Sequence, residues 1–173
     1  MSAKVKTGIA GGICSVAVII GLVLDNDHVR TNQRGLELIG NAEGCRRDPY
    51  NCPAGILTDG VGNTHGVKPG IRKTDKQIAA DWEKNILDAE QCVNRYANGT
   101  KLPDNTFSSA VEITFNVGCS TMQKSTMFRL FRQGELVAAC NELPRWAYAN
   151  GIRLNGLVTR RAESKALCLD GLK

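Results

Sequence analysis

The chain has 173 residues, a formal net charge of +5, ordinary apolar content and few aromatic residues. This length predicts one compact domain with room for a short appendage. Seven cysteines are many for this length, but there are only two histidines and no Cys-x-x-Cys pair, so no metal site is expected. The basic charge suits a polyanionic partner such as nucleic acid, an anionic membrane or peptidoglycan, although a solubilising surface explains it equally well.

Residues 7–24 form the first distinctive segment, and its sequence TGIAGGICSVAVIIGLVL contains no charged residue. A segment of this length just spans a bilayer core of ~30 Å at ~1.5 Å per residue. Lys4 and Lys6 precede it, which predicts a cytoplasmic N-terminus and a chain that continues outside the membrane. Because glycine, serine and threonine lower its hydrophobicity, we interpret residues 1–27 as a weak transmembrane segment.

Two alternatives exist for this segment. A cleaved signal peptide would need a small-x-small cleavage site, and none follows near residues 22–27. A permanent membrane anchor is the other alternative. A weak anchor differs from both because it can leave the membrane when the membrane potential collapses. An inside-negative potential opposes outward movement of each positive charge by ~2.3 kcal/mol per 100 mV.

Residues 31–42 carry apolar residues at helical spacing and predict a helix that ends at Glu43. The chain from residue 46 to 70 is rich in glycine, proline, asparagine and aspartate, with short apolar runs on either side of Asp59-Gly60. This composition predicts a small β-hairpin rather than a buried sheet. Residues 31–72 are therefore expected to form a small β lobe.

A long helix is predicted to begin at Thr74, which forms a capping box with Gln77, and to stop at Asn98-Gly99. Residues 73–98 would thus connect two lobes. The helical segments expected after it, in a lobe of residues 99–173, are 106–117, 125–133, 135–142 and 159–168. The predicted fold class is α+β, mostly helical, with one domain over residues 28–173 behind the N-terminal segment.

Three residues carry the chemistry: Glu43, then Cys52 after eight intervening residues, then Thr58 after five more. Cleavage of a glycosidic bond needs a proton donor on the leaving oxygen and a second group on the opposite face of the sugar. This frame resembles the catalytic signature of the phage lysozymes, glycoside hydrolase family 24. In that family a Glu is the acid, and an Asp, or in some members a Cys, lies nine positions on. The resemblance covers roughly residues 31–170.

The resemblance implies a lysozyme-like fold and a role for each residue of the frame. Glu43 would be the acid, Cys52 the nucleophile or base, and Thr58 the residue that positions a water or a sugar hydroxyl. A cysteine fills this role only when it is reduced and deprotonated, so the chain departs from the usual two-carboxylate arrangement. The Thr-x-Gly-x-Gly stretch of the family implies substrate-binding positions at Gly60, Gly62 and Asn63.

Further matches to the family lie near the C-terminus, and we interpret them as structural. Phe115-Asn116-Val117-Gly118 resembles a helix and turn of the family's helical lobe. Trp146, Arg160 and Glu163 resemble its C-terminal block, where core packing and an ion pair explain them better than catalysis.

The resemblance to the signal-arrest-release subgroup of endolysins assigns a regulatory role to Cys14, Cys45 and Cys52. A Cys45–Cys52 disulfide would block the enzyme while it is tethered. After release, Cys14 would bond Cys45 and free Cys52 by thiol–disulfide exchange. The alternative is a permanent Cys45–Cys52 bond, with Asp48 or Asp59 in the catalytic role.

Four cysteines remain, and they would form two structural disulfides in an oxidising compartment. The spacing does not determine their connectivity. We favour Cys92–Cys119 and Cys140–Cys168.

The expected function is that of a phage endolysin, a muramidase that hydrolyses the β-1,4 bond between N-acetylmuramic acid and N-acetylglucosamine. It is expected to need no cofactor, bind no nucleic acid, act as a monomer and depend on a holin. It would be exported inactive, face the periplasm from the host inner membrane through residues 7–24, and then be released. The alternatives are a lytic transglycosylase, which would yield an anhydro sugar, and a non-catalytic tethered protein that binds the wall.

Overall fold

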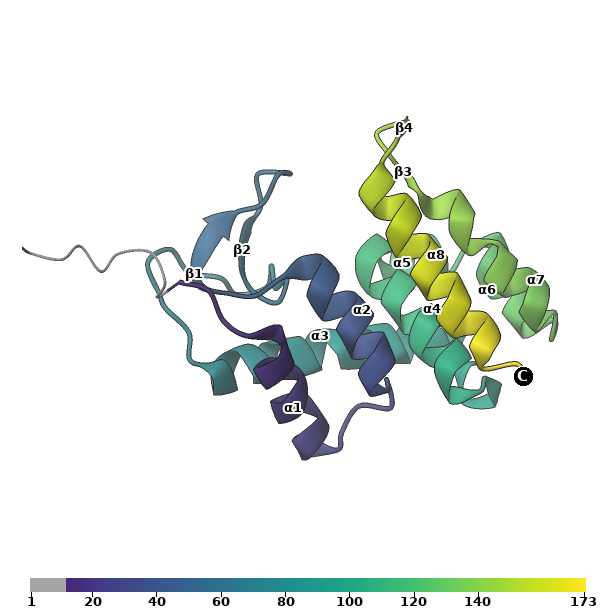
Figure 1. Ribbon diagram of the computed structural model, residues 1–173, viewed down its shortest axis with the longest axis horizontal. Coiled ribbons are helices and arrows are strands. Elements are labelled where there is room, and N and C mark those ends of the chain that lie inside the picture. Colours follow the sequence, from purple (N-terminus) through teal and green to yellow (C-terminus); the bar gives the residue numbers. More distant parts are fainter. Residues whose placement is uncertain (1–11) are drawn as a thin grey trace, which may run out of the picture.

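The computed structural model describes residues 12–173. Figure 1 shows a small lobe with a two-stranded antiparallel sheet, a larger lobe of packed helices, and a long helix that runs beneath both. The elements in chain order are α1 (Val16–Asn26), α2 (Gln33–Glu43), β1 (Arg46–Asn51), β2 (Leu57–Gly60), α3 (Asp75–Tyr96), a 3-10 turn (Gly99–Lys101), α4 (Asp104–Val117), α5 (Cys119–Met122), α6 (Thr126–Arg132), α7 (Leu136–Asn141), a second 3-10 turn (Leu143–Trp146), β3 (Tyr148–Ala149), β4 (Ile152–Arg153) and α8 (Asn155–Asp170).

Helix α2 delivers Glu43 to the boundary between the lobes. Asn32 caps its N-terminus by accepting a hydrogen bond from a backbone N–H of the first turn. Leu36 and Ile39, the apolar residues seen at helical spacing, are fully buried. The helix ends because Gly44 takes a φ of 70°, which residues with a side chain rarely adopt. Glu43 is therefore the last helical residue.

The β lobe is built around the hairpin of β1 and β2, in which Tyr50 lies opposite Thr58. The pairing is irregular between Arg46 and Tyr50. At the end of β2 the chain turns tightly at Gly60, whose φ is 53° and whose missing side chain leaves room for Ile78 of α3. The hairpin thus rests directly on the long helix.

Helix α3 connects the two lobes, as Figure 1 shows. The predicted capping box of Thr74 and Gln77 is confirmed. Trp82, Ile86 and Val93 are fully buried along the inner face of the helix. A single helix of 22 residues therefore supports the β lobe at one end and the helical lobe at the other.

Helix α4 is the centre of the helical lobe, and α2, α3 and α8 pack around it. Its core side chains are completely buried: Phe107, Val111 and Ile113. Two disulfides tie the surrounding helices together. One joins Cys92 of α3 to Cys119 of α5, and the other joins Cys140 of α7 to Cys168 of α8. These are the two pairs that we favoured from the sequence.

The apolar N-terminal segment does not form the continuous helix expected over residues 7–24. Its first residues, 7–11, lie outside the described residues, and residues 12–15 are not helical. Within residues 12–173 no helix is both long enough and apolar enough to cross a bilayer. Helix α1 instead packs against α2 and α3 and buries Ile19 and Val23 completely. In this structure the protein body, rather than lipid, covers the apolar face of the segment.

A second hairpin, β3–β4, is a feature that the sequence did not predict. Tyr148 pairs with Arg153 and Ala149 with Ile152. The turn contains Asn150-Gly151, both at positive φ, which is a strong local hairpin signal. The strands have only two residues each, so they carry no alternating pattern that sequence reasoning can detect.

Candidate active site

Glu43 is held between the two lobes, with 25% of its side chain exposed. Arg160 of α8 donates a hydrogen bond from Nη1 to Glu43 Oε1 over 3.1 Å. On the β-lobe side Gly62 approaches so closely that a Cβ atom there would lie 3.0 Å from Glu43 Oε2. One carboxylate oxygen is therefore paired with a cation, and the other faces a glycine that leaves space beside it.

Arg160 is fixed in turn by a buried carboxylate. Its Nε donates to Glu112 Oε1 over 2.5 Å, and Glu112 has no exposed surface. The other oxygen of Glu112 accepts hydrogen bonds from Arg161 and Ser164. A buried carboxylate needs such compensation, and this network gives Arg160 a single position from which to hold Glu43.

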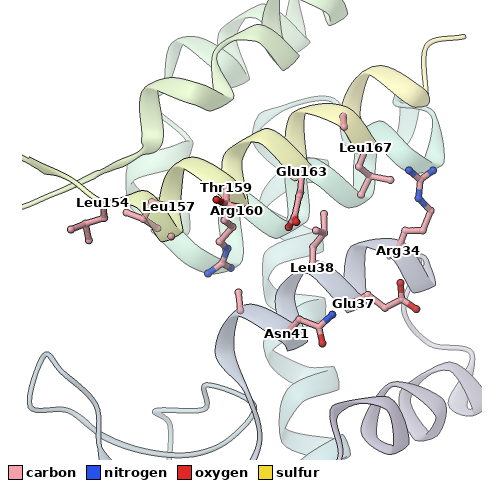
Figure 2. Close-up of a pocket in the computed structure, with 13 residues that line it drawn as sticks. Arg34, Glu37, Leu38, Asn41, Leu154, Leu157, Thr159, Arg160, Glu163 and Leu167 are labelled. Carbon is pink, nitrogen blue, oxygen red and sulfur yellow. The ribbon is translucent and has the colours of Figure 1, made fainter.

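The ion pair expected around Arg160 is therefore different from the one in the structure. We expected an ion pair that involves Arg160 and Glu163, but Arg160 pairs with Glu43 and Glu112. Glu163 has no ion-pair partner among residues 12–173 and is exposed to solvent. Figure 2 shows Arg160 pointing from α8 toward α2, whereas Glu163 lies one turn further along α8.

Cys52 follows β1 directly and is the only free cysteine in the described part of the chain. The backbone amide of Ile56, followed by that of Ala54 and the Thr58 hydroxyl, donates to its sulfur and lowers the pKa of the Cys52 thiol, against a smaller opposing effect of burial. A lower pKa increases the thiolate fraction near neutral pH, and the thiolate is the reactive form.

Thr58 lies in β2 and is only 3% exposed. Its hydroxyl lies 2.9 Å from the carbonyl oxygen of Ile56 and is also a donor to the Cys52 sulfur, so its single proton serves one of these two acceptors at a time. Tyr50, opposite Thr58, has a pKa raised mainly by burial, with Arg46 opposing and the negative charges of Glu43 and Cys52 adding to the rise.

The third disulfide joins Cys14 to Cys45. The backbone around it is also paired: the N–H of Cys14 donates to the carbonyl of Cys45 over 3.3 Å, and the N–H of Arg47 donates to the carbonyl of Gly12 over 2.7 Å. Residues 12–14 thus lie along the start of β1 like a short extra strand. Cys45 is occupied by Cys14 in this structure, and Cys52 is not bonded.

The structure also places the two aspartates of the alternative mechanism. Asp48 pairs with Arg72 over 2.6 Å, and the hydrogen bond from Arg72 lowers the pKa of Asp48. Asp59 is 1% exposed and pairs with Lys73 over 2.7 Å. Both carboxylates are therefore engaged in ion pairs within the β lobe, and the buried one has no open surface for a substrate.

The expected substrate-binding residues fall into two groups. Asn63 is 2% exposed, and its amide forms internal hydrogen bonds with Asp59 and Asn85. Gly60 is likewise buried against α3. Both positions maintain the shape of the hairpin. Gly62 alone lines a cavity.

Two cavities flank Glu43. The first, of about 380 Å³, is lined by residues of the β lobe, α3 and α4: Gly62, Thr64, His65, Asn85, Asp88, Ala89, Thr114, Phe115, Gly118 and Cys119. The second, of about 1020 Å³, is a groove between α2 and α8 that Arg160 lines (Figure 2). We call it the α2–α8 groove. The first cavity reaches Glu43 through Gly62 and the groove reaches it through Arg160.

No group of three His, Cys, Asp or Glu side chains within residues 12–173 is arranged to hold a metal ion. The reactive groups that this site presents are a carboxyl, a thiol, a hydroxyl and a guanidinium. Together they are suited to acid–base and nucleophilic chemistry.

Known proteins resemble this chain over most of its length. The family model for phage lysozyme matches residues 40–164, and the chain belongs to the phage lysozyme family. A relative of 53% identity, over 98% of this chain and 98% of its own, is the SAR-endolysin of Escherichia phage P1. The SAR-endolysin of Haemophilus phage HP1 is 36% identical over 81% of both chains.

The solved structures of one relative exist in two forms. The crystal structure of the active form of P1 phage endolysin Lyz superposes with a TM-score of 0.91 at 52% identity, covering 95% of this chain and 98% of that one. The secreted inactive form of Lyz gives a TM-score of 0.59 at the same 52% identity, over 83% of this chain and 97% of that one. The arrangement of the present chain is thus closer to the form described as active.

Proposed function

We propose that this chain is a phage endolysin with muramidase activity, which hydrolyses the β-1,4 bond between N-acetylmuramic acid and N-acetylglucosamine in peptidoglycan. The observation that carries the proposal is the position of Glu43, which Arg160 holds between two cavities, while Cys52 of the adjacent hairpin lobe is unbonded. The family membership supports the same reaction class.

In the proposed mechanism Glu43, once protonated, donates its proton to the leaving glycosidic oxygen. The thiolate of Cys52 either attacks the anomeric carbon or takes a proton from a water that attacks it. Thr58 supports Cys52 by donating a hydrogen bond that favours the thiolate. Arg160 keeps the Glu43 carboxyl in place while the sugar binds, and this lowers the entropic cost of reaching the reactive geometry.

The proposed thiol switch follows from the hairpin. Cys45 precedes β1 and Cys52 follows it, so about 20 Å of extended strand separates them at ~3.3 Å per residue. A disulfide requires Cα atoms within ~7 Å of each other. A Cys45–Cys52 bond is therefore incompatible with β1 as seen here. That bond would both remove the Cys52 thiolate and dismantle the hairpin beside Glu43.

Activation then proceeds by an exchange that conserves electrons. The Cys14 thiolate attacks the Cys45 sulfur, the Cys45–Cys52 bond breaks, and Cys52 leaves as a thiolate. The product is the Cys14–Cys45 disulfide with a free Cys52, which is the pairing in this structure. The exchange needs Cys14 beside Cys45, and docking of α1 on α2 and α3 provides this.

We further propose that residues 1–27 first hold the chain in the host inner membrane, with the remaining residues 28–173 facing the periplasm. Holin-dependent loss of the membrane potential would then favour release. The fully buried Ile19 and Val23 support this proposal, because the protein body offers the segment a second apolar environment after it leaves lipid. Peptidoglycan is the substrate, and the released enzyme acts as a monomer without a cofactor.

The test is the loss of turbidity of purified peptidoglycan, with the full chain beside its Glu43→Gln variant. We expect lysis with the first and a decrease of at least 100-fold with the second, since general acid catalysis contributes roughly 10²–10⁴. Mass spectrometry of the products should show reducing sugars. Anhydro sugars would instead identify a lytic transglycosylase, and equal lysis by both proteins would exclude Glu43 as the acid.

A further inference from the structure

The connector between α1 and α2, residues 27–32, is fixed to the protein body at its C-terminal end. The backbone N–H and the hydroxyl of Thr31 both donate to Glu90 Oε1, over 2.6 Å and 2.7 Å. Glu90 belongs to α3 and is buried. Arg30 donates to the Asp104 carboxylate over 3.0 Å and to two backbone carbonyls that follow α3. None of these bonds involves α1, so this end of the connector can stay on the body while α1 lies elsewhere.

The N-terminal end of the connector carries a second set of contacts, and these do involve α1. Asn26, the last residue of α1, donates from Nδ2 to Glu83 Oε2 of α3 over 2.7 Å. The Nδ1 atom of His28 lies 2.8 Å from the other oxygen of this carboxylate, Oε1. An ionised carboxylate only accepts hydrogen bonds, so His28 is the donor. We call these three residues the Asn26–His28–Glu83 clamp.

The environment of Glu83 favours this double contact. Only 13% of its side chain is exposed, whereas 66% of the His28 side chain is exposed. Burial raises the pKa of Glu83, but the hydrogen bonds from Asn26 and His28 outweigh burial and lower it. Both donors come from the end of α1 and the residues next to it. The carboxylate therefore receives its compensation for burial only when α1 lies against α3.

Apolar packing by itself leaves the orientation of α1 undetermined. From Val16 to Leu24 the helix has no polar or charged side chain, so it is apolar on every side. Burial of apolar surface is non-directional, and several rotations of such a helix about its axis would bury a similar area. In this structure Ile19 and Val23 are fully buried, while Val18 of the same helix is 50% exposed. A directional contact is needed to select this rotation.

The residues between the clamp and the fixed end of the connector are suited to act as a hinge. Asp27 ends α1 with a φ of 53°, in the left-handed region, and hinges are often a few residues at the end of an element. The N-terminal end of α1 lies ~16 Å from this point at ~1.5 Å per residue. A swing of roughly 20° moves that end by roughly 6 Å, which is comparable to the ~7 Å limit between Cα atoms that form a disulfide.

We propose that the Asn26–His28–Glu83 clamp captures α1 after it leaves the membrane and fixes its direction, so that Cys14 meets Cys45. The inference rests on the proposed thiol switch and adds to it the contact that orients the attacking thiol. Glu83 is thus a positioning residue for the exchange. It lines neither of the two cavities beside Glu43, so its removal should slow activation and leave the activated enzyme unchanged.

The test follows disulfide exchange in cells that export the full chain. An uncoupler collapses the membrane potential, N-ethylmaleimide quenches samples at intervals, and peptide mapping measures how fast the Cys14–Cys45 disulfide forms. Glu83→Ala removes both acceptor oxygens and should slow this exchange about tenfold, because two hydrogen bonds to a charged group are lost while solvent screens part of the clamp. Glu83→Gln keeps one acceptor oxygen and should slow it about threefold.

His28→Ala and Asp25→Ala form a matched pair at the end of α1. Both side chains are exposed, and of the two only His28 bonds Glu83. His28→Ala should slow the exchange about threefold, and Asp25→Ala should leave it unchanged. Adding His28→Ala to Glu83→Ala should cause no further slowing, since the partner of His28 is already missing.

The outcomes separate this inference from the proposed function. Exchange at the wild-type rate in Glu83→Ala, or equal slowing by Asp25→Ala, would overturn the role of the clamp. A loss of lytic activity in fully exchanged Glu83→Ala by the same factor as the loss in exchange rate would also overturn it, because that result shows a general structural role. These three results leave the thiol switch in place. A wild-type chain that never forms Cys14–Cys45 after depolarisation would instead remove the proposed switch, and the role of the clamp with it.

Discussion

At the scale of single residues, the site depends on pairs that are far apart in the chain. Glu43 and Arg160 are separated by 117 positions, and Arg160 is held by a buried Glu112. The sequence frame identified Glu43 and Cys52 as candidates because they are neighbours in the chain. We interpreted Arg160 as a structural residue, because no local sequence pattern shows which carboxylate an arginine will contact in the folded protein. Buried charge networks become visible only in the folded structure.

The hydrogen bonds around Cys52 lead to a prediction about pH. Donation from Ile56, Ala54 and Thr58 stabilises the thiolate and lowers the pKa of Cys52, so activity that needs the thiolate should rise as the pH rises through that lowered pKa. Thr58→Val removes one donor and should raise the pKa. The ascending limb of the pH–rate profile should then move to higher pH, with a lower rate at neutral pH.

Thr58→Ser is the control for this prediction, because it keeps the hydroxyl and should keep the profile close to that of the wild type. The rate of Cys52 alkylation by iodoacetamide, measured against pH, reports the thiolate directly. If alkylation and activity in Thr58→Val both follow the wild-type pH dependence, the hydroxyl does not stabilise the thiolate.

At the scale of elements, local sequence signals predicted most helices, but they did not predict where the N-terminal apolar segment packs. The capping box of α3 and the end of α2 at Glu43 follow from a few neighbouring residues, and the structure contains both. The segment before Asp25 is different, because an apolar stretch of that composition can be buried in lipid or in protein. Composition alone does not distinguish these two environments, and in this structure α1 is covered by α2 and α3.

Gly40 is the contact that allows α1 to approach α2. A Cβ atom at this position would lie 2.6 Å from Val16 Cγ1 and 3.4 Å from Trp82. Gly40→Ala should therefore destabilise the folded protein by about 1 kcal/mol, because overpacking costs roughly 1–3 kcal/mol while the gain in helix propensity offsets about 1 kcal/mol of it. Urea unfolding of the oxidised protein measures the difference.

Two comparisons make the Gly40 prediction specific. Gly21→Ala in α1 has nothing within 4 Å of the new methyl group, so it should be neutral or stabilising. In a Val16→Ala background, Gly40→Ala should become stabilising, because the smaller side chain removes the clash. Strict additivity of the two substitutions would show that α1 does not dock through this contact.

At the scale of the whole molecule, the fold determines which disulfides can form, and the disulfide pairing in turn limits which fold is possible. The hairpin separates Cys45 from Cys52, so the arrangement seen here permits the Cys14–Cys45 bond and prohibits Cys45–Cys52. The lower similarity to the secreted inactive form of Lyz than to its active form is consistent with two folds of one chain. The pairing of these three cysteines would then determine whether the β lobe forms.

The substitution Cys14→Ser tests this coupling in purified, air-oxidised protein. Without Cys14, Cys45 has only Cys52 as a free partner, because the other four cysteines are paired. We expect a protein without lytic activity and without a thiol that iodoacetamide can alkylate. Adding Cys45→Ser should restore most of the activity, since Cys52 then stays free and β1 can form. The double variant should still be less stable than the wild type by about 3–4 kcal/mol, because it lacks the constraint on the unfolded chain of a disulfide that spans 31 residues.

Full lytic activity of oxidised Cys14→Ser would show that Cys45 does not capture Cys52, and the switch would have to be abandoned. Restored activity in the double variant would instead mean that Cys14 is needed only to occupy Cys45 and takes no part in catalysis.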